Sequence, residues 1–159
     1  MLPGGVFTYW KLQLGNHNNF KSSIMDTSTL FIRQSAEYLC EYQAKIVRCL
    51  GELSDEQIWY RPNDQSNSIG NLILHLCGNV RQWIGEGVGG KPYPRERQQE
   101  FDERVPRERD TLLSELASTI DDAADAIKRL TPEKLLEERT IQSLFGKSFF
   151  RQSPEQKSN

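Results

Sequence analysis

Residues 53–83 read LSDEQIWYRPNDQSNSIGNLILHLCGNVRQW, and this stretch decides the fold. Ser54 and Gln57 have the spacing of a capping box, which predicts a short helical turn. Ser68 is a suitable N-cap for a longer helix over residues 68–85. Apolar residues of this longer helix repeat at steps of three and four: Ile69, Leu72, Ile73, Leu76, Val80, Trp83 and Ile84. This period predicts one apolar stripe along a bundle helix.

Two further amphipathic helices are predicted on either side of this stretch. One covers residues 27–51, where Gly51 suits a helix C-terminus because glycine readily adopts left-handed backbone angles. The other covers residues 106–130 and is followed by a short helix over residues 131–138. Glycine and proline residues between 85 and 104 predict an irregular loop that is long enough to cover the mouth of a site.

No fourth amphipathic helix is predicted after residue 140. The sequence therefore predicts an all-α fold with three long helices, and a bundle built for four helices would have one groove open. We expect a poorly ordered extension over residues 1–25, a helical bundle domain over residues 26–145 and an irregular tail over residues 146–159. Met25 is the expected natural start, because Asp26 and Thr27 behind it are good N-cap residues.

The composition excludes several classes of protein. Hydrophobic residues make up 36% and charged residues 26% of the 159 residues, and the formal net charge is -2. A nucleic-acid-binding protein needs a concentrated excess of Lys and Arg, so no nucleic-acid partner is expected. No apolar run approaches the ~20 residues of a membrane span, and the N-terminus lacks the features of a secretory signal. Three cysteines without a CxxC pair are typical of reduced thiols, so we expect a cytoplasmic protein.

His75 is the main candidate for chemistry, because it is the only histidine of the predicted bundle domain. On a helical wheel it lies about 120° from the centre of the apolar stripe, which is typical of a partly exposed boundary residue. The alternative interpretation is a metal ligand or a general base. Spacing alone does not favour that alternative, since the domain has no second histidine to share a metal.

The other candidates are assigned structural roles. Cys40 and Cys49 are predicted to lie in the core. Residues 91–109 mix basic and acidic side chains and are predicted to form a solvated segment. Three aspartates are predicted to form a solvated helix face, and three aromatic residues are predicted to pack at helix ends; they are Asp121, Asp122 and Asp125, and Trp59, Tyr60 and Trp83.

The stretch that decides the fold resembles the DinB-like (YfiT-like) superfamily, and within it the DUF1572 type. The resemblance rests on the Leu-Ser-x-Glu-Gln turn that begins at Leu53, the Trp and Arg-Pro after it, the Asn-Ser-Ile-Gly start of a helix, and His75 six residues after Ile69. It covers roughly residues 27–142. The resemblance implies an antiparallel four-helix bundle, often a homodimer, in which three histidines hold a divalent metal such as Zn or Ni.

The same resemblance implies that His75 is one of the three metal ligands. The other two form a His-x-x-x-His pair on the last helix of such bundles, and no such pair occurs in this chain. We therefore expect a chain that is truncated before the last helix, with that helix missing or incomplete and the metal site incomplete. The chemistry implied for the family is a metal-activated thiolate or water, as in a thiol S-transferase or a hydrolase, with a low-molecular-weight thiol as partner.

The sequence leaves two hypotheses open. The first is a protein of uncharacterised activity, derived from a divalent-metal enzyme whose metal site this chain does not retain in full. The alternative is a non-catalytic helical module that forms a homodimer through the groove left by the missing helix. Residues 6–14, which are rich in aromatic and leucine side chains, are a second candidate to fill that groove.

Overall fold

The computed structural model describes residues 26–139 and residue 141. Three long helical segments lie in this part of the chain: α1 (Thr27–Gly51), α3 (Ile69–Val80) with its π-helical continuation η1 (Arg81–Glu86), and α5 (Arg109–Lys128). Two short helices lie between them, α2 (Asp55–Trp59) and α4 (Arg97–Asp102), and the 3-10 helix η2 (Pro132–Leu136) follows α5. No strand occurs among the described residues, and the all-α prediction is confirmed.

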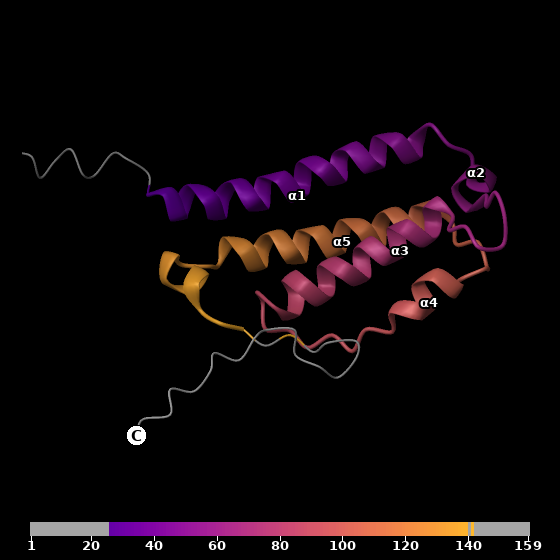
Figure 1. Ribbon diagram of the computed structural model, residues 1–159. Coiled ribbons are helices and arrows are strands. Elements are labelled where there is room, and N and C mark those ends of the chain that lie inside the picture. The colour runs from indigo at the N-terminus through magenta and orange to yellow at the C-terminus, as the bar shows by residue number, and fades with distance from the viewer. Residues whose placement is uncertain (1–25, 140, 142–159) are drawn as a thin grey trace, which may run out of the picture.

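The three long segments form one packed unit around α5. α1 runs opposite to α3 and α5, as Figure 1 shows. α5 packs along both α1 and α3, whereas the backbones of α1 and α3 approach each other at few points. α4 packs on α3, and α2 joins the end of α1 to the start of α3. The long helices are therefore held together mainly through α5.

The core lies where α1, α2 and α3 meet α5. α5 contributes Leu112, Leu116, Ile120 and Ala123, all buried. The residues that meet them from the other helices are Leu50 of α1, Ile58 of α2, and Ile73, Leu74, Cys77 and Val80 of α3. Each large aliphatic side chain buried here contributes about 1.5–3 kcal/mol, so this cluster is the main stabilising element of the unit.

Both predicted helix starts in the stretch 53–83 are confirmed. The Ser54 hydroxyl accepts a hydrogen bond from the backbone N–H of Gln57, and the Gln57 side chain accepts one from the backbone N–H of Ser54. Ser68 caps α3 in the same way together with Asn71. These reciprocal bonds satisfy N–H groups that a helix start leaves without partners. The bounds predicted for the first helix, residues 27–51, also agree with α1.

The region between the second and third long helices is more regular than predicted. η1 extends the helical path to Glu86, and α4 forms inside the segment for which the sequence predicts an irregular loop. The third long helix begins at Arg109 and not at residue 106. The backbone carbonyl of Arg107 accepts a hydrogen bond from the indole N–H of Trp59 at 3.0 Å, which holds it outside the helix.

Several residues predicted to be buried are exposed. Cys40 and Cys49 lie on the outer side of α1, so their assignment to the core is wrong. The exposed apolar residues of α3, η1 and the turn after α2 are Ile69, Leu72, Trp83 and Tyr60. Within α3, the helices that pack on it, α5, α4 and α2, leave Ile69 and Leu72 uncovered.

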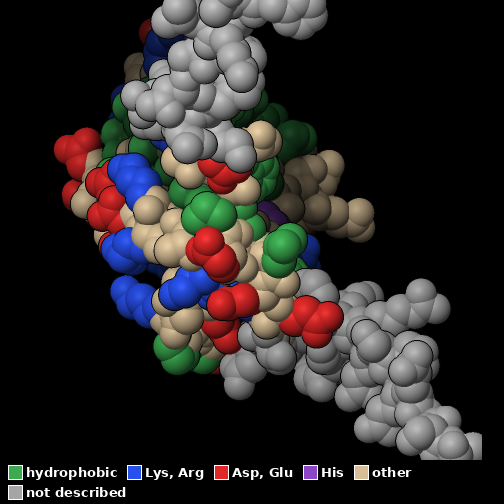
Figure 2. Space-filling view, turned by 90° about the vertical axis from the view of Figure 1, so that its left-hand side faces the viewer, with side chains coloured by type: hydrophobic (Ala, Val, Ile, Leu, Met, Phe, Trp, Pro, Cys, Tyr) green, Lys and Arg blue, Asp and Glu red, His purple; other side chains and the backbone are tan. Residues whose placement is uncertain are grey.

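The surface mixes charges of both signs. At the end of the molecule that holds the start of α1 and the last turn of α5, basic and acidic side chains are interspersed with hydrophobic ones (Figure 2). No helix in the described part of the chain is long and apolar enough to cross a membrane. The predicted extension over residues 1–25, the tail over residues 146–159 and the segment 6–14 lie outside the described residues.

Candidate functional site

His75 lies in the middle of α3, beside α4. Its side chain is 29% exposed, which confirms the expected boundary position. The Nδ1 atom lies 2.9 Å from Oε2 of Glu100, a residue of α4. The imidazole ring also packs on the ring of Phe101, with 4.7 Å between the ring centres. Two neighbouring residues of α4 therefore fix the orientation of this imidazole.

Arg95 joins the same group from the chain segment before α4. Its Nε donates to Oε1 of Glu100 at 2.6 Å and its Nη2 donates to Oε2 at 2.8 Å. Nη2 also donates to the backbone carbonyl of His75 at 3.2 Å, and Nη1 donates to Oε1 of Gln82 at 3.0 Å. The Arg95 side chain is only 2% exposed. Bidentate pairing with a carboxylate and further hydrogen bonds stabilise a buried guanidinium.

These contacts indicate the direction of the hydrogen bond between His75 and Glu100. Nη2 of Arg95 has two hydrogens, and the acceptors Oε2 of Glu100 and the carbonyl of His75 take both. Nδ1 of His75 lies 3.0 Å from Nη2, so it receives no hydrogen from Arg95 in this arrangement and instead donates its own to Glu100.

A second arginine holds α4 on α3. Nη2 of Arg61 donates to Oδ1 of Asn71 at 2.5 Å and to the carbonyl of Glu103 at 2.9 Å. Nδ2 of Asn71 donates to the carbonyls of Glu100 and Glu103 at 2.9 and 3.1 Å. The last carbonyls of a helix have no partners within it, so Arg61 and Asn71 supply the donors that the end of α4 needs.

Gly78 is the position that lets α4 and Arg95 approach α3 closely. A Cβ atom at this position would overlap the carboxylate of Glu100 and would lie 2.9 Å from Nε of Arg95. Gly70 serves the same purpose near the start of the helix, where a Cβ atom would lie 2.8 Å from the ring of Trp59. Both glycines therefore let a side chain lie directly on the backbone of α3.

The prediction that residues 91–109 form a solvated segment is wrong for its central part. Arg95 and Glu100 are largely buried, and they escaped detection because the segment alternates charges without an apolar period. The partners His75 and Glu100 are 25 positions apart, and no local spacing relates them. One available signal was Gly78, since a glycine inside a good helix often marks a close approach.

The described residues do not assemble a complete metal site. No group of three or more His, Cys, Asp or Glu side chains suited to a metal ion occurs among residues 26–139 and 141. Both oxygens of Glu100, the carboxylate nearest to His75, accept hydrogen bonds from Arg95. Cys77 is buried and forms no hydrogen bond with His75 or Glu100, and burial raises the pKa of its thiol. His75, the metal ligand predicted from the sequence, therefore lies in an ordered polar setting.

The architecture and this polar group define a class: an all-helical protein in which a short helix is bound to a long one by two arginines and a carboxylate–histidine pair. The chain belongs to the family described as "Protein of unknown function (DUF1572)", whose model matches residues 26–144. No curated protein and no solved structure matches the chain.

Proposed function

We propose that this protein is a DinB-like, non-catalytic helical module that forms a homodimer through two exposed apolar stripes. The α1 stripe consists of Phe31, Tyr38 and Tyr42, and the second stripe consists of Leu72 of α3 and Trp83 of its continuation η1. Tyr38 and Tyr42 are 54% and 59% exposed, and Leu72 is 51% exposed. The observation that carries the proposal is that both helices pack on α5 and still present a second apolar stripe.

The spacing of the stripes separates them from ordinary exposed residues. Phe31, Tyr38 and Tyr42 are seven and four positions apart, so they lie on one side of α1. Single exposed apolar residues need no explanation, whereas aromatic residues gathered along one helix face are typical of a contact surface. A second copy of the chain supplies the same stripes, and a two-fold axis allows each stripe to meet its equivalent.

The DinB-like placement explains why these stripes lack a cover within the described part of the chain. A DinB-like bundle has four helices, and the described part supplies three long ones, with α1 opposite in direction to the other two. Such a bundle is held by apolar faces on each helix. The stripes are the faces that a further helix would cover, and in the proposed dimer the partner's helices cover them.

Metal binding is the second candidate, and one observation favours it. Metal-bound histidines commonly donate their other ring N–H to a carboxylate, and Nδ1 of His75 does so to Glu100. Zn or Ni bound by this protein would meet Nε2 of His75. The described residues do not fit a complete site, because they offer one imidazole and their nearest carboxylate is already bonded to Arg95. The expected low-molecular-weight thiol partner depends on that metal chemistry.

Light scattering after size-exclusion chromatography tests the dimer. The wild-type protein is expected to elute with the mass of two chains. The double variant Tyr38→Glu/Tyr42→Glu is expected to elute as a monomer, because burying two carboxylates at an interface without partners is costly. The control is Tyr60→Glu, an exposed tyrosine outside both stripes. A wild-type monomer, or a double variant that stays dimeric with a native circular dichroism spectrum, refutes the proposal.

Metal analysis after dialysis against Zn or Ni separates the second candidate. The proposal of a non-catalytic module predicts less than one metal ion per chain, and the same metal content in the variant His75→Ala. One tightly bound ion per chain that His75→Ala removes would favour the metal protein instead.

A further inference from the structure

A cleft of about 400 Å³ lies between α5, η1 and the chain segment after η1. It is separate from the group around His75 and from both apolar stripes, so a ligand bound there does not depend on the proposed dimer. The apolar part of its lining includes Val80, Pro92, Ala123 and Ala126. Its volume lies within the range of about 300–1,000 Å³ that small-molecule sites occupy.

The backbone around the cleft is arranged to keep it open. The wall formed by η1 is π-helical, a conformation that is rare and often found at functional sites. Gly85 and Gly89 line the cleft without side chains. A Cβ atom on Gly89 would lie 2.7 Å from the backbone carbonyl oxygen of Gly85 and 3.2 Å from the Cβ atom of Ala126, so no side chain fits there without a shift of the backbone. Gly90 turns the chain with a φ of 69°.

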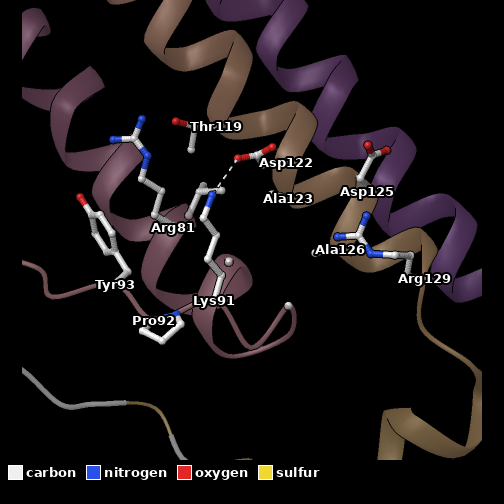
Figure 3. Close-up of a pocket in the computed structure, with 13 residues that line it drawn as sticks. Arg81, Lys91, Pro92, Tyr93, Thr119, Asp122, Ala123, Asp125, Ala126 and Arg129 are labelled. Atoms are coloured by element: carbon white, nitrogen blue, oxygen red, sulfur yellow. Dashed lines mark ion pairs between the residues drawn. The ribbon is translucent and has the colours of Figure 1, made fainter.

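Charged side chains of both signs also line the cleft. Lys91 reaches up from the segment after η1 toward Asp122 on α5, as Figure 3 shows. Nζ of Lys91 lies 3.6 Å from Oδ2 of Asp122, and the two side chains are 79% and 71% exposed. An ion pair this long and this exposed contributes little to stability and opens readily.

A second pair of charges lines the cleft nearer the end of α5. Arg129 has no ion-pair partner among the residues that the structure describes, and its guanidinium lies beside Ala126 in Figure 3. Asp125 lies one helical turn before Arg129 and also lines the cleft, and its Oδ1 lies 3.6 Å from Nζ of Lys128. Arg81 also lines the cleft, but its Nη1 lies 2.7 Å from Oε1 of Glu115. Because Arg81 is already paired, we do not assign it to a ligand.

We propose that the cleft binds a small zwitterion of the α-amino acid class with an apolar side chain. Its carboxylate would pair with Lys91 and Arg129, and its ammonium group with Asp122 and Asp125. The side chain would lie on Ala123 and Ala126. The carboxyl end of α5 also favours a positive group at its last turn. A simple anion would meet the two aspartates, and a simple cation would meet Lys91 and Arg129, so neither fits as well.

Nuclear magnetic resonance titration of the full chain with L-leucine tests this assignment. We expect saturable shifts of the amide signals of Gly89, Ala123 and Ala126, with a dissociation constant on the order of 1 mM, as few exposed ion pairs allow. Leucinamide lacks the carboxylate and N-acetyl-leucine lacks the ammonium group. Each is expected to bind at least about fivefold more weakly than leucine, since each loses one of the two pairs of contacts.

Charge-neutralising variants locate the contacts. Lys91→Gln and Asp122→Asn are each expected to weaken leucine binding by about fivefold or more. Both positions are exposed, so the fold is expected to remain intact. Lys45→Gln is the matched control, because Lys45 is an exposed lysine paired with Glu41 on α1, away from the cleft. Absence of saturable shifts, equal binding of leucine and the two derivatives, or unchanged affinity in both variants would overturn the proposal.

Discussion

Arg95 binds Glu100 through two parallel hydrogen bonds, Nε to Oε1 at 2.6 Å and Nη2 to Oε2 at 2.8 Å. Oε2 of Glu100 also accepts the Nδ1–H of His75. One carboxylate thus joins the segment before α4, α4 itself and α3. The position of α4 depends on this carboxylate more than on apolar contacts, since Phe101, the one hydrophobic residue of α4, is only partly buried.

The first prediction concerns this ion pair. Arg95→Met removes the cation and leaves the largely buried Glu100 without its main partner. Loss of one member of a buried pair costs about 3–5 kcal/mol, so we expect a loss near the lower limit because Glu100 retains His75. Urea unfolding followed by circular dichroism measures the change. An unfolding free energy within about 0.5 kcal/mol of wild type would contradict the role assigned to Arg95.

The second prediction concerns the close approach at Gly78. Alanine would normally stabilise a helix interior by about 1 kcal/mol relative to glycine. At position 78 its Cβ atom would displace the carboxylate of Glu100, so Gly78→Ala is expected to destabilise the protein by about 1–2 kcal/mol. Gly51→Ala is the control, because nothing lies within 4 Å of a Cβ atom there. Equal effects of the two substitutions would show that α4 does not rest on Gly78.

The third prediction concerns the three thiols. Burial raises the pKa of the Cys77 thiol, while Cys40 and Cys49 are exposed. The thiolate is the reactive form, so iodoacetamide at about pH 8 is expected to modify Cys40 and Cys49 quickly and Cys77 only after unfolding. Peptide mass spectrometry over time gives the three rates. Rapid modification of native Cys77 would mean that α3 and α5 separate there.

The fourth prediction concerns acid stability. The backbone N–H of Val105, and then Arg107, hold the pKa of Glu103 below its usual value of 4.5. A carboxylate with a lowered folded pKa adds stability above its unfolded pKa, and this contribution is lost as the pH falls through the folded pKa. The variant Glu103→Gln is expected to lose less stability than wild type as the pH falls below about 4.5. Urea unfolding at several pH values measures this, and parallel profiles would count against it.

Local signals predicted the helices well because they act within a few residues. The capping boxes at Ser54 and Ser68 and the period of α1 were sufficient to define those elements. α4 was missed because its stability comes from Arg61 and Arg95, which lie outside it in sequence. A six-residue helix without an apolar period has no signal of its own.

The candidate site was predictable only in part. His75 was recognised from its place in a motif, whereas its partner Glu100 depends on how α4 folds back on α3. Leu72 and Trp83 belong to the apolar stripe predicted for the second helix and yet are exposed, because an apolar period does not show by what a face is covered. The cleft beside Lys91 depends on a π-helical segment that no spacing in the sequence predicted.

Hydroxyl-radical footprinting at increasing protein concentration tests the central claim, that the two apolar stripes form a dimer interface. We expect Tyr38, Tyr42 and Leu72 to become protected over the concentration range in which the measured mass rises from one chain to two. Tyr60 is exposed outside both stripes and should keep its reactivity throughout. A dimer that forms while Tyr38 and Tyr42 remain fully reactive would contradict this interface.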